Sequence, residues 1–172
     1  MAFPGRPLFA FSTMSLQQRL ERQLQSTRQM SEKLLADFKT PHDWVHQVHP
    51  GCNHALWFAG HMATSDNFFL SLIAPDKKKD ISDYQTKFGM GSQPANITDW
   101  PEVTEVRAQL EAQVHRIVEL LLTNADEISA RLNTPPREGD WPLVPGMIHA
   151  CHDEARHQGE MMLLQKLWRA GD

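Results

Sequence analysis

The sequence predicts an all-α protein, a four-helix bundle with a long loop between its second and third long helices. Four segments show apolar residues recurring every three or four positions, the period of an amphipathic helix, and no segment shows convincing strand alternation. The 172 residues suit one domain with one core. We expect residues 1–14 to form a flexible arm and residues 15–172 to form a single helical domain.

The first helix is expected from about Ser15 to Lys39. Ser15 and Gln18 have the spacing of a capping box, which would satisfy backbone N–H groups at the helix start. Pro41 ends the segment. The predicted apolar stripe consists of Leu16, Leu20, Leu24, Thr27, Met30, Leu34 and Phe38.

The second helix is expected to begin near Asn53, a favourable N-cap residue, and to end at about Ile73. Its predicted stripe consists of Trp57, Phe58, His61, Ser65, Phe68 and Leu72. The stretch over 75–100 is rich in Gly, Pro, Asp and Lys and is long for a connection inside a bundle, which indicates a crossover or a flap over a site. The basic run over 77–79 lies between two aspartates, as in a solvated loop.

The third helix follows Asp99 and Pro101 and runs to about Thr123. A short extra helix is expected over 124–132, after which two prolines and a glycine break the chain. The last helix is expected from about Leu143 or Pro145 to residue 169.

The apolar face of the last helix turns ionisable toward its N-terminal half. The stripe of its C-terminal half consists of Met161, Leu164 and Trp168, and helical steps backward from it pass through His157, Asp153 and His149. Burying unpaired charge costs several kcal/mol, so such a face needs a partner or an ion. A metal ion would meet this need.

Helical spacing favours Asp153 and His157 as a ligand pair. Residues four apart lie one above the other, roughly 6 Å apart, and can close on a single ion. His149 and Asp153 also meet this condition. His152 and His157 point about 140° apart, and His149 lies about 12 Å from His157 along the axis.

A third ligand must come from another helix, and His61 is the best candidate because it lies in the middle of the second stripe. His54 lies on the same face nearer the helix start and would line the approach, whereas His115 is expected at the surface. Two histidines and one carboxylate with open positions are typical of a catalytic site. These ligands suit Zn, Ni, Mn or Fe(II).

Plainer interpretations fit the same residues. A single histidine in a helical stripe is usually a core or boundary residue. Asp153 and His157 could form a surface ion pair, and the run from His152 to Arg156 could be a solvated face. Spacing alone leaves these alternatives open beside the metal site.

Composition and charge narrow the class of protein. Apolar residues make up 41% and charged residues 22%, as in globular proteins, and the net charge of −4 argues against nucleic acid as a partner. No apolar run approaches the roughly 20 residues that span a bilayer, so no membrane partner is expected. Cys52 and Cys151 without a CxxC motif favour a reduced, cytoplasmic location.

Two stretches resemble the DinB/YfiT-like metalloenzyme family. The stretch from Pro50 to Ala63, with its Gly60-His61 pair, looks like the family's second helix and its "GH" metal histidine. The stretch from Asp153 to Glu160 looks like the family's terminal H-x-x-x-H-x-G-Q. Their order and spacing fit the chain from about residue 15 onward.

The resemblance implies a bundle in which three metal ligands come from the second and last long helices. His61 and His157 then take the first and third ligand positions, and Asp153 replaces the usual histidine at the second. A carboxylate can still ligate, but it lowers the charge of the site and leaves open that His149 or His152 takes this position. Related bundles are often dimers, so a homodimer is the implied assembly.

Characterised relatives include enzymes that use the thiols mycothiol, bacillithiol or glutathione. The resemblance therefore implies a metal-dependent thiol S-transferase or a hydrolase acting on a small molecule, with a low-molecular-weight thiol as a candidate partner. A divalent metal deprotonates a bound thiol or activates water. Glu160 is the candidate catalytic base, or else a group that orients His157. The alternative is a non-catalytic metal-binding or structural bundle that has lost this chemistry.

Overall fold

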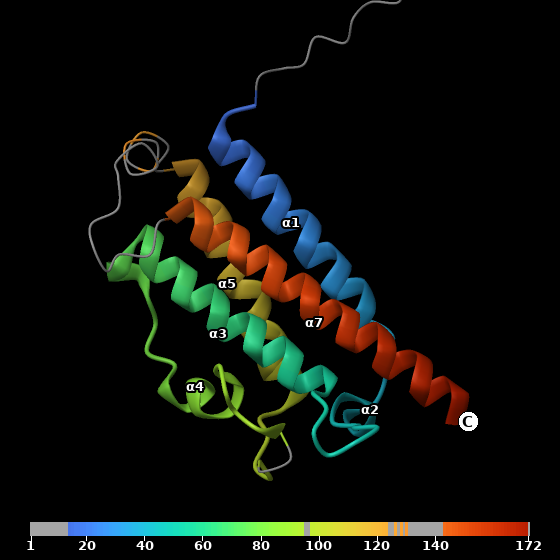
Figure 1. Cartoon of the computed structure of the whole chain (residues 1–172). Helices are drawn as coiled ribbons and strands as arrows, with labels where there is room; N and C mark the ends of the chain where they lie inside the picture. Colours follow the sequence, from blue (N-terminus) through green and yellow to red (C-terminus); the bar gives the residue numbers. More distant parts are fainter. Residues whose placement is uncertain are drawn as a thin grey trace, which may run out of the picture.

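Four long helices and three short elements make up the described chain (Figure 1). The computed structural model describes residues 14–94, 97–123, 126, 128, 130 and 143–171, and no strand occurs among them. The elements are α1 (Leu16–Leu35), α2 (Pro41–Trp44), α3 (Ala55–Ile73), η1 (Pro75–Lys77), α4 (Ser82–Phe88), α5 (Val103–Thr123) and α7 (Leu143–Gly171). The predicted all-α bundle is therefore confirmed.

The long helices are arranged with α1 and α3 on one diagonal of the bundle. Each of these two packs against both α5 and α7. Helices α1 and α7 run in one direction and α3 and α5 in the other (Figure 1). Because α3 and α5 are parallel neighbours, the chain must return along the bundle between them. Residues 74–102, with η1 and α4, make this return, and α4 packs against α3.

Helix α1 begins where the sequence predicts and ends earlier. The Gln18 N–H donates to Ser15 Oγ (3.2 Å) and the Ser15 N–H donates to Gln18 Oε1 (2.9 Å), which confirms the capping box. The helix ends at Leu35, and Pro41 is the first residue of α2 rather than the terminator of α1. The intervening turn lets Phe38 pack into the core.

The buried face of α1 differs from the predicted stripe. Leu16 and Met30 are 45% and 50% exposed, whereas Arg28 and Ser31 are buried. The buried face of the helix is formed by Leu20, Leu24, Thr27, Arg28, Ser31 and Leu35. Apolar periodicity did not detect it fully because part of this face carries a charge.

Helix α3 lies at the centre of the structure and is buried on nearly every side. Its N-cap is His54 rather than Asn53, since His54 Nδ1 accepts from the Trp57 N–H (3.0 Å). His54 is buried, so it does not line the approach to the site. Phe68, predicted to be part of the stripe, is 40% exposed.

The remaining helices agree with the sequence pattern. Helix α5 buries Val106, Leu110, Ile117 and Leu121, and His115 is exposed as predicted. Most of the short helix expected over 124–132, and the arm expected over 1–14 apart from Met14, lie outside the described residues.

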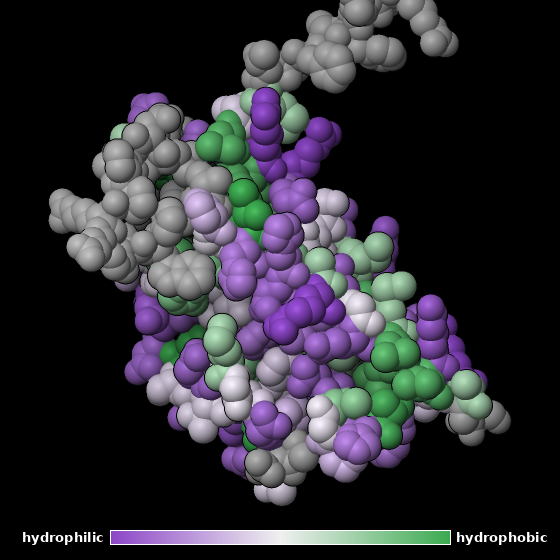
Figure 2. All heavy atoms as spheres, in the orientation of Figure 1, coloured by the Kyte–Doolittle hydropathy of each residue, from purple (hydrophilic) through white to green (hydrophobic). Residues whose placement is uncertain are grey.

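The described surface contains both polar and apolar regions. Hydrophobic side chains gather near the C-terminal end of α7 (Figure 2), where Leu163 and Leu167 are 56% and 47% exposed. None of the described helices combines the length and the apolar composition that crossing a bilayer requires. Cys52 and Cys151 are both free thiols.

Candidate metal centre

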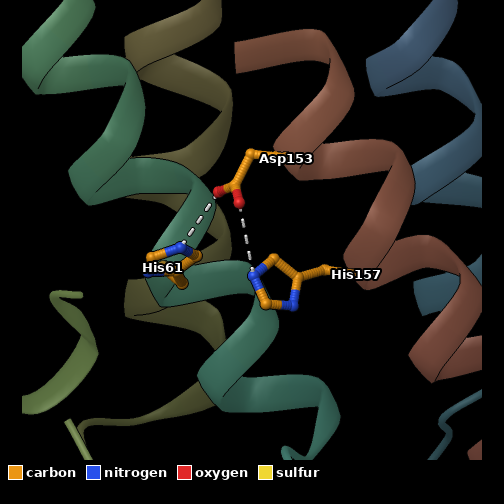
Figure 3. Close-up of side chains that lie close together, drawn as sticks. All are labelled: His61, Asp153 and His157. Carbon is orange, nitrogen blue, oxygen red and sulfur yellow. Dashed lines mark hydrogen bonds and ion pairs between the residues drawn. The ribbon is translucent and has the colours of Figure 1, made fainter. Parts of the chain in front are cut away.

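His61 from α3 and Asp153 and His157 from α7 point toward one another between the two helices (Figure 3). His61 Nε2 lies 3.2 Å from Asp153 Oδ2, and His157 Nε2 lies 3.9 Å from Asp153 Oδ1. One ligand atom of each residue lies within 4.8 Å of the others, so the group could hold a metal ion. The three residues predicted from spacing and resemblance are thus brought together.

Aromatic packing limits the freedom of both imidazole rings. The Trp57 ring stacks on His61 with centroids 4.6 Å apart and meets His157 edge-on at 5.3 Å. His61 and His157 are buried, whereas Asp153 is partly exposed. Rings held in this way keep their nitrogen atoms aimed at one place, which a metal site requires.

The backbone of α4 fixes the orientation of His61. His61 Nδ1 lies 2.7 Å from the Phe88 carbonyl oxygen, which can only accept a hydrogen bond, so Nδ1 carries the proton. In the neutral ring the lone pair is then on Nε2, facing Asp153. Phe88 can approach α3 this closely because residue 60 is glycine: a Cβ there would overlap the Phe88 ring.

Two polar side chains fix the orientation of His157. Its Nδ1 lies 2.8 Å from Glu160 Oε2, and the same oxygen accepts from Asn53 Nδ2 (2.9 Å). Its Nε2 lies 3.0 Å from Arg156 Nη2, which can only donate, so this nitrogen offers a lone pair. Asn53, predicted as a helix cap, instead holds the carboxylate that orients a candidate ligand.

These orientations fit a divalent cation. Two imidazole lone pairs and a carboxylate face one another, an arrangement that is repulsive unless a positive charge lies among them. If His61 Nε2 carries a proton instead of facing an ion, its hydrogen bond to Asp153 is the main cause of a lowered pKa of Asp153, about 2, to which Arg156 contributes. Asp153 is therefore ionised at neutral pH. Two histidines and one carboxylate suit Zn, Ni, Mn or Fe(II).

Arg156 supplies a positive charge at the same place. Its Nη2 donates to Asp153 Oδ1 at 2.7 Å and lies at 3.0 Å from the His157 ring nitrogen, while its side chain is 65% exposed. The guanidinium thus contacts two of the three candidate ligands from the solvent side. Arg156 could not be identified as a site residue from the sequence, because an arginine on a charged helix face gives no distinct signal.

A cavity of about 730 Å³ opens beside the three residues. His61 and Asp153 lie in its wall, and the segment from Pro75 to Met90 supplies the opposite side. His149, an alternative for the second ligand, borders the cavity outside the group of three. The other alternative, His152, is exposed. The cavity therefore gives access to His61 and Asp153.

A buried ionic network lies behind the candidate ligands. Arg28 on α1 pairs with Asp66 on α3 and with Glu154 on α7, each at 2.9 Å, and all three side chains are nearly inaccessible. Burial raises the pKa of Asp66 to about 6, although Arg28 opposes the rise. Glu154 follows Asp153 directly, so the network ties this part of α7 to the two other helices.

The sequence pattern did not indicate this ionic network, because its residues are far apart in the chain. The run from His152 to Arg156 was open to interpretation as a solvated face, yet Glu154 within it is buried. Ser31 Oγ donates to Glu154, and Gln158 also joins the network because its Nε2 donates to Ser31 Oγ at 2.9 Å. Only the position of Arg28 beside Thr27 on a helical stripe gave a signal, since charged residues rarely face a core without a partner.

The fold and the site together define a class: helical bundles with a histidine–aspartate–histidine group, able to hold a metal ion, between two facing helices. The sequence profile described as the DinB superfamily matches residues 23–161, which is most of the chain. The protein belongs to the DinB superfamily, as the resemblance indicated. No curated protein matches the sequence significantly.

Proposed function

We propose that the protein is a metal-dependent enzyme acting on a small molecule, as a thiol S-transferase or a hydrolase. One observation carries the proposal. The Nδ1 atoms of His61 and His157 are held by Phe88 and Glu160, which leaves both Nε2 lone pairs facing Asp153. Histidine ligands of catalytic metals are commonly oriented in this manner, by a carbonyl or a carboxylate on the second nitrogen.

His61, Asp153 and His157 would hold the ion, and three protein ligands would leave positions open for a substrate. When bound, a divalent ion at this point would lower the pKa of a thiol or of water enough to yield a nucleophile near neutral pH. The cavity meets the group at His61 and Asp153, so a small molecule would approach from that side. Trp57 excludes water from the opposite side of the His61 ring.

Glu160 acts in this proposal through His157. Its Oε2 is engaged by the His157 ring and by Asn53, and the ring atom that it contacts is the one directed away from Asp153. To serve as a catalytic base, Glu160 would have to leave both partners. The predicted role of catalytic base remains a separate hypothesis, which a Glu160→Gln variant would test.

A second candidate function is a metal-free or non-catalytic bundle, and Arg156 favours it. Its guanidinium already gives Asp153 and His157 a cationic partner, so the group has a stable arrangement without an ion. The homodimer and the cytoplasmic location stay predictions that are independent of this choice.

Metal analysis separates the two candidates. Untagged protein purified without a nickel column is analysed for transition metals, beside His61→Ala and, as a control, His115→Ala, which changes an exposed histidine on α5. We expect about one ion per chain in the wild type and the control, and a loss of the ion in His61→Ala. Wild-type protein that contains no metal and takes up none on dialysis would overturn the proposal.

Ligand stabilisation then tests the chemistry. The metal-loaded protein is heated with a panel of low-molecular-weight thiols, since a ligand that binds only the folded state raises its unfolding temperature. A thiol that stabilises the wild type but not His157→Ala supports the transferase. Stabilisation by none of the thiols, with ester or amide turnover that requires His157, would support the hydrolase.

A further inference from the structure

We propose that the cavity beside the candidate metal centre binds a small organic anion, a molecule with an apolar body and one carboxylate or sulfonate group. Its negative end would pair with Lys78 and Lys79, and its other end would reach His61 and Asp153. This inference rests on the proposed function where it places the reactive end of the molecule. The anion site itself depends on other residues.

The apolar part of the proposal comes from the walls of the cavity. Its volume of about 730 Å³ suits a small organic molecule. Phe68, Phe69, Ile81 and Met90 all border it. Phe68 is 40% exposed and Met90 is 88% exposed, so a bound molecule would cover apolar surface that now faces water.

The charged part of the proposal rests on two lysines that pair with no acidic residue in the described ranges. Lys78 and Lys79 border the cavity, and neither forms an ion pair with any residue in the described part of the chain. Their neighbours differ: Lys77 pairs with Asp76 at 3.6 Å, and Lys87 pairs with Asp99 at 2.7 Å. Two positive charges at one cavity are thus left for a ligand.

A buried amide holds the backbone of Lys79 in place. Asn67 on α3 is 2% exposed, and its Oδ1 accepts from the Lys79 N–H while its Nδ2 donates to the Lys79 carbonyl, each at 3.0 Å. Both backbone groups of Lys79 are therefore fixed to α3. Asn67 follows His61 by six residues, a rise of about 9 Å along the helix. A ligand reaching both ends is comparable in length to a medium-chain carboxylate.

The acidic residues of the cavity do not cancel this charge. Asp80 Oδ1 accepts from the Ser82 N–H at 3.1 Å, beside the start of α4, and Asp153 is engaged by His61 and Arg156. Because Arg156 pairs with Asp153, the two lysines outweigh Asp80 in charge without an ion, and a bound divalent ion would add to this surplus. A cavity with surplus positive charge raises the local concentration of anions.

Two fluorescent probes with similar aromatic bodies test the proposal on the full chain. The anionic probe is 8-anilinonaphthalene-1-sulfonate, and the neutral probe is N-phenyl-1-naphthylamine. Both are titrated in EDTA into the wild type, into Lys78→Gln/Lys79→Gln, and into Lys77→Gln, a control on the same segment that lies outside the cavity wall. We expect the double variant to weaken binding of the anion at least tenfold, and the control to change it less than twofold. The neutral probe should change less than twofold in both variants.

A third variant shows where the probes bind. Phe68→Ala removes an exposed side chain of the cavity wall and should weaken binding of both probes, and circular dichroism verifies that each variant is folded. Equal binding of the sulfonate to the wild type and the double lysine variant would overturn the inference, as would binding that is unaffected by Phe68→Ala. If the lysine effect is found in a protein that binds no metal, the anion site stands and the proposed function fails. If metal binds and the lysine effect is missing, the proposed function stands and the anion site fails.

Discussion

Phe88 packs directly on Gly60, and its backbone carbonyl accepts a hydrogen bond from the residue after that glycine, His61. One close approach therefore links the return segment to the orientation of a candidate ligand. A Cβ on residue 60 would overlap the Phe88 ring, which is fully buried. The glycine is needed for this contact between α3 and α4.

We predict that Gly60→Ala destabilises the fold and weakens metal binding together. Overpacking of this kind costs about 1–3 kcal/mol. Movement of Phe88 would also remove the carbonyl from His61. Urea unfolding in EDTA measures the stability, and competition with a chelator measures the metal affinity. The control is Gly159→Ala on α7, where a Cβ meets no atom of the described residues within 4 Å and alanine should stabilise by roughly 0.5–1 kcal/mol. Equal effects of the two changes would contradict the prediction.

We predict that Arg156→Gln increases metal affinity about tenfold. The guanidinium contacts Asp153 Oδ1 and His157 Nε2, which are atoms that a metal ion would use, so ion and arginine compete. Removing the competing cation should lower the dissociation constant, which chelator competition can measure. Arg169→Gln is the control, since Arg169 pairs with Asp37 at the surface at 2.7 Å. A lower affinity in Arg156→Gln would mean that the arginine assists the ion rather than competing with it.

Two substitutions of Glu160 distinguish its two candidate roles. Glu160→Ala removes the acceptor from His157 and should lower metal affinity about 10- to 100-fold, as is typical when a group that orients a metal histidine is removed. Glu160→Gln keeps an acceptor oxygen and should change the affinity only a few-fold. If Glu160→Gln binds metal normally but loses turnover, Glu160 acts as the catalytic base instead.

We predict that Arg28→Met strongly destabilises the protein. The change leaves the carboxylates of Asp66 and Glu154 buried without their cation, and breaking a buried pair by removing one partner costs about 3–5 kcal/mol. Urea unfolding checks the value. Arg107→Met is the control, since Arg107 pairs only loosely with Glu32, at 3.7 Å on the surface. A loss below 1 kcal/mol in Arg28→Met would show that water or protonation compensates.

The parts of the site that local rules govern could be predicted from the sequence. Asp153 and His157 are four apart on one helix, and His61 lies in the centre of an apolar stripe, so spacing indicated the ligands. The orienting groups could not be predicted, because they depend on contacts between distant segments: Phe88 with His61, and Asn53 with Glu160.

The difference between local patterns and contacts of distant segments also explains where the predicted fold was wrong. The capping box of α1 is a local pattern and was correct. The end of α1 was placed too late because the packing of Phe38 against Trp44 and Trp168 turns the chain earlier than Pro41 requires. The stripe of α1 missed Arg28, because a charge on a buried face depends on partners from other helices.

Finally, His54 should make stability depend on pH. Burial lowers its pKa from 6.5 to about 4, because its Nε2 has no hydrogen-bond partner among the described residues and its Nδ1 must stay unprotonated to accept from Trp57. The unfolded chain binds this proton more readily than the folded chain. The contribution of neutral His54 to the free energy of unfolding is therefore complete above pH 6.5 and is lost as the pH falls toward 4 and below. Between pH 7 and pH 5 it should fall by about 2 kcal/mol.

The control, His54→Asn, keeps an N-cap acceptor without a titrating group. Urea unfolding of both proteins in EDTA should show the wild type losing more stability over this range, and identical pH dependence would contradict the assignment.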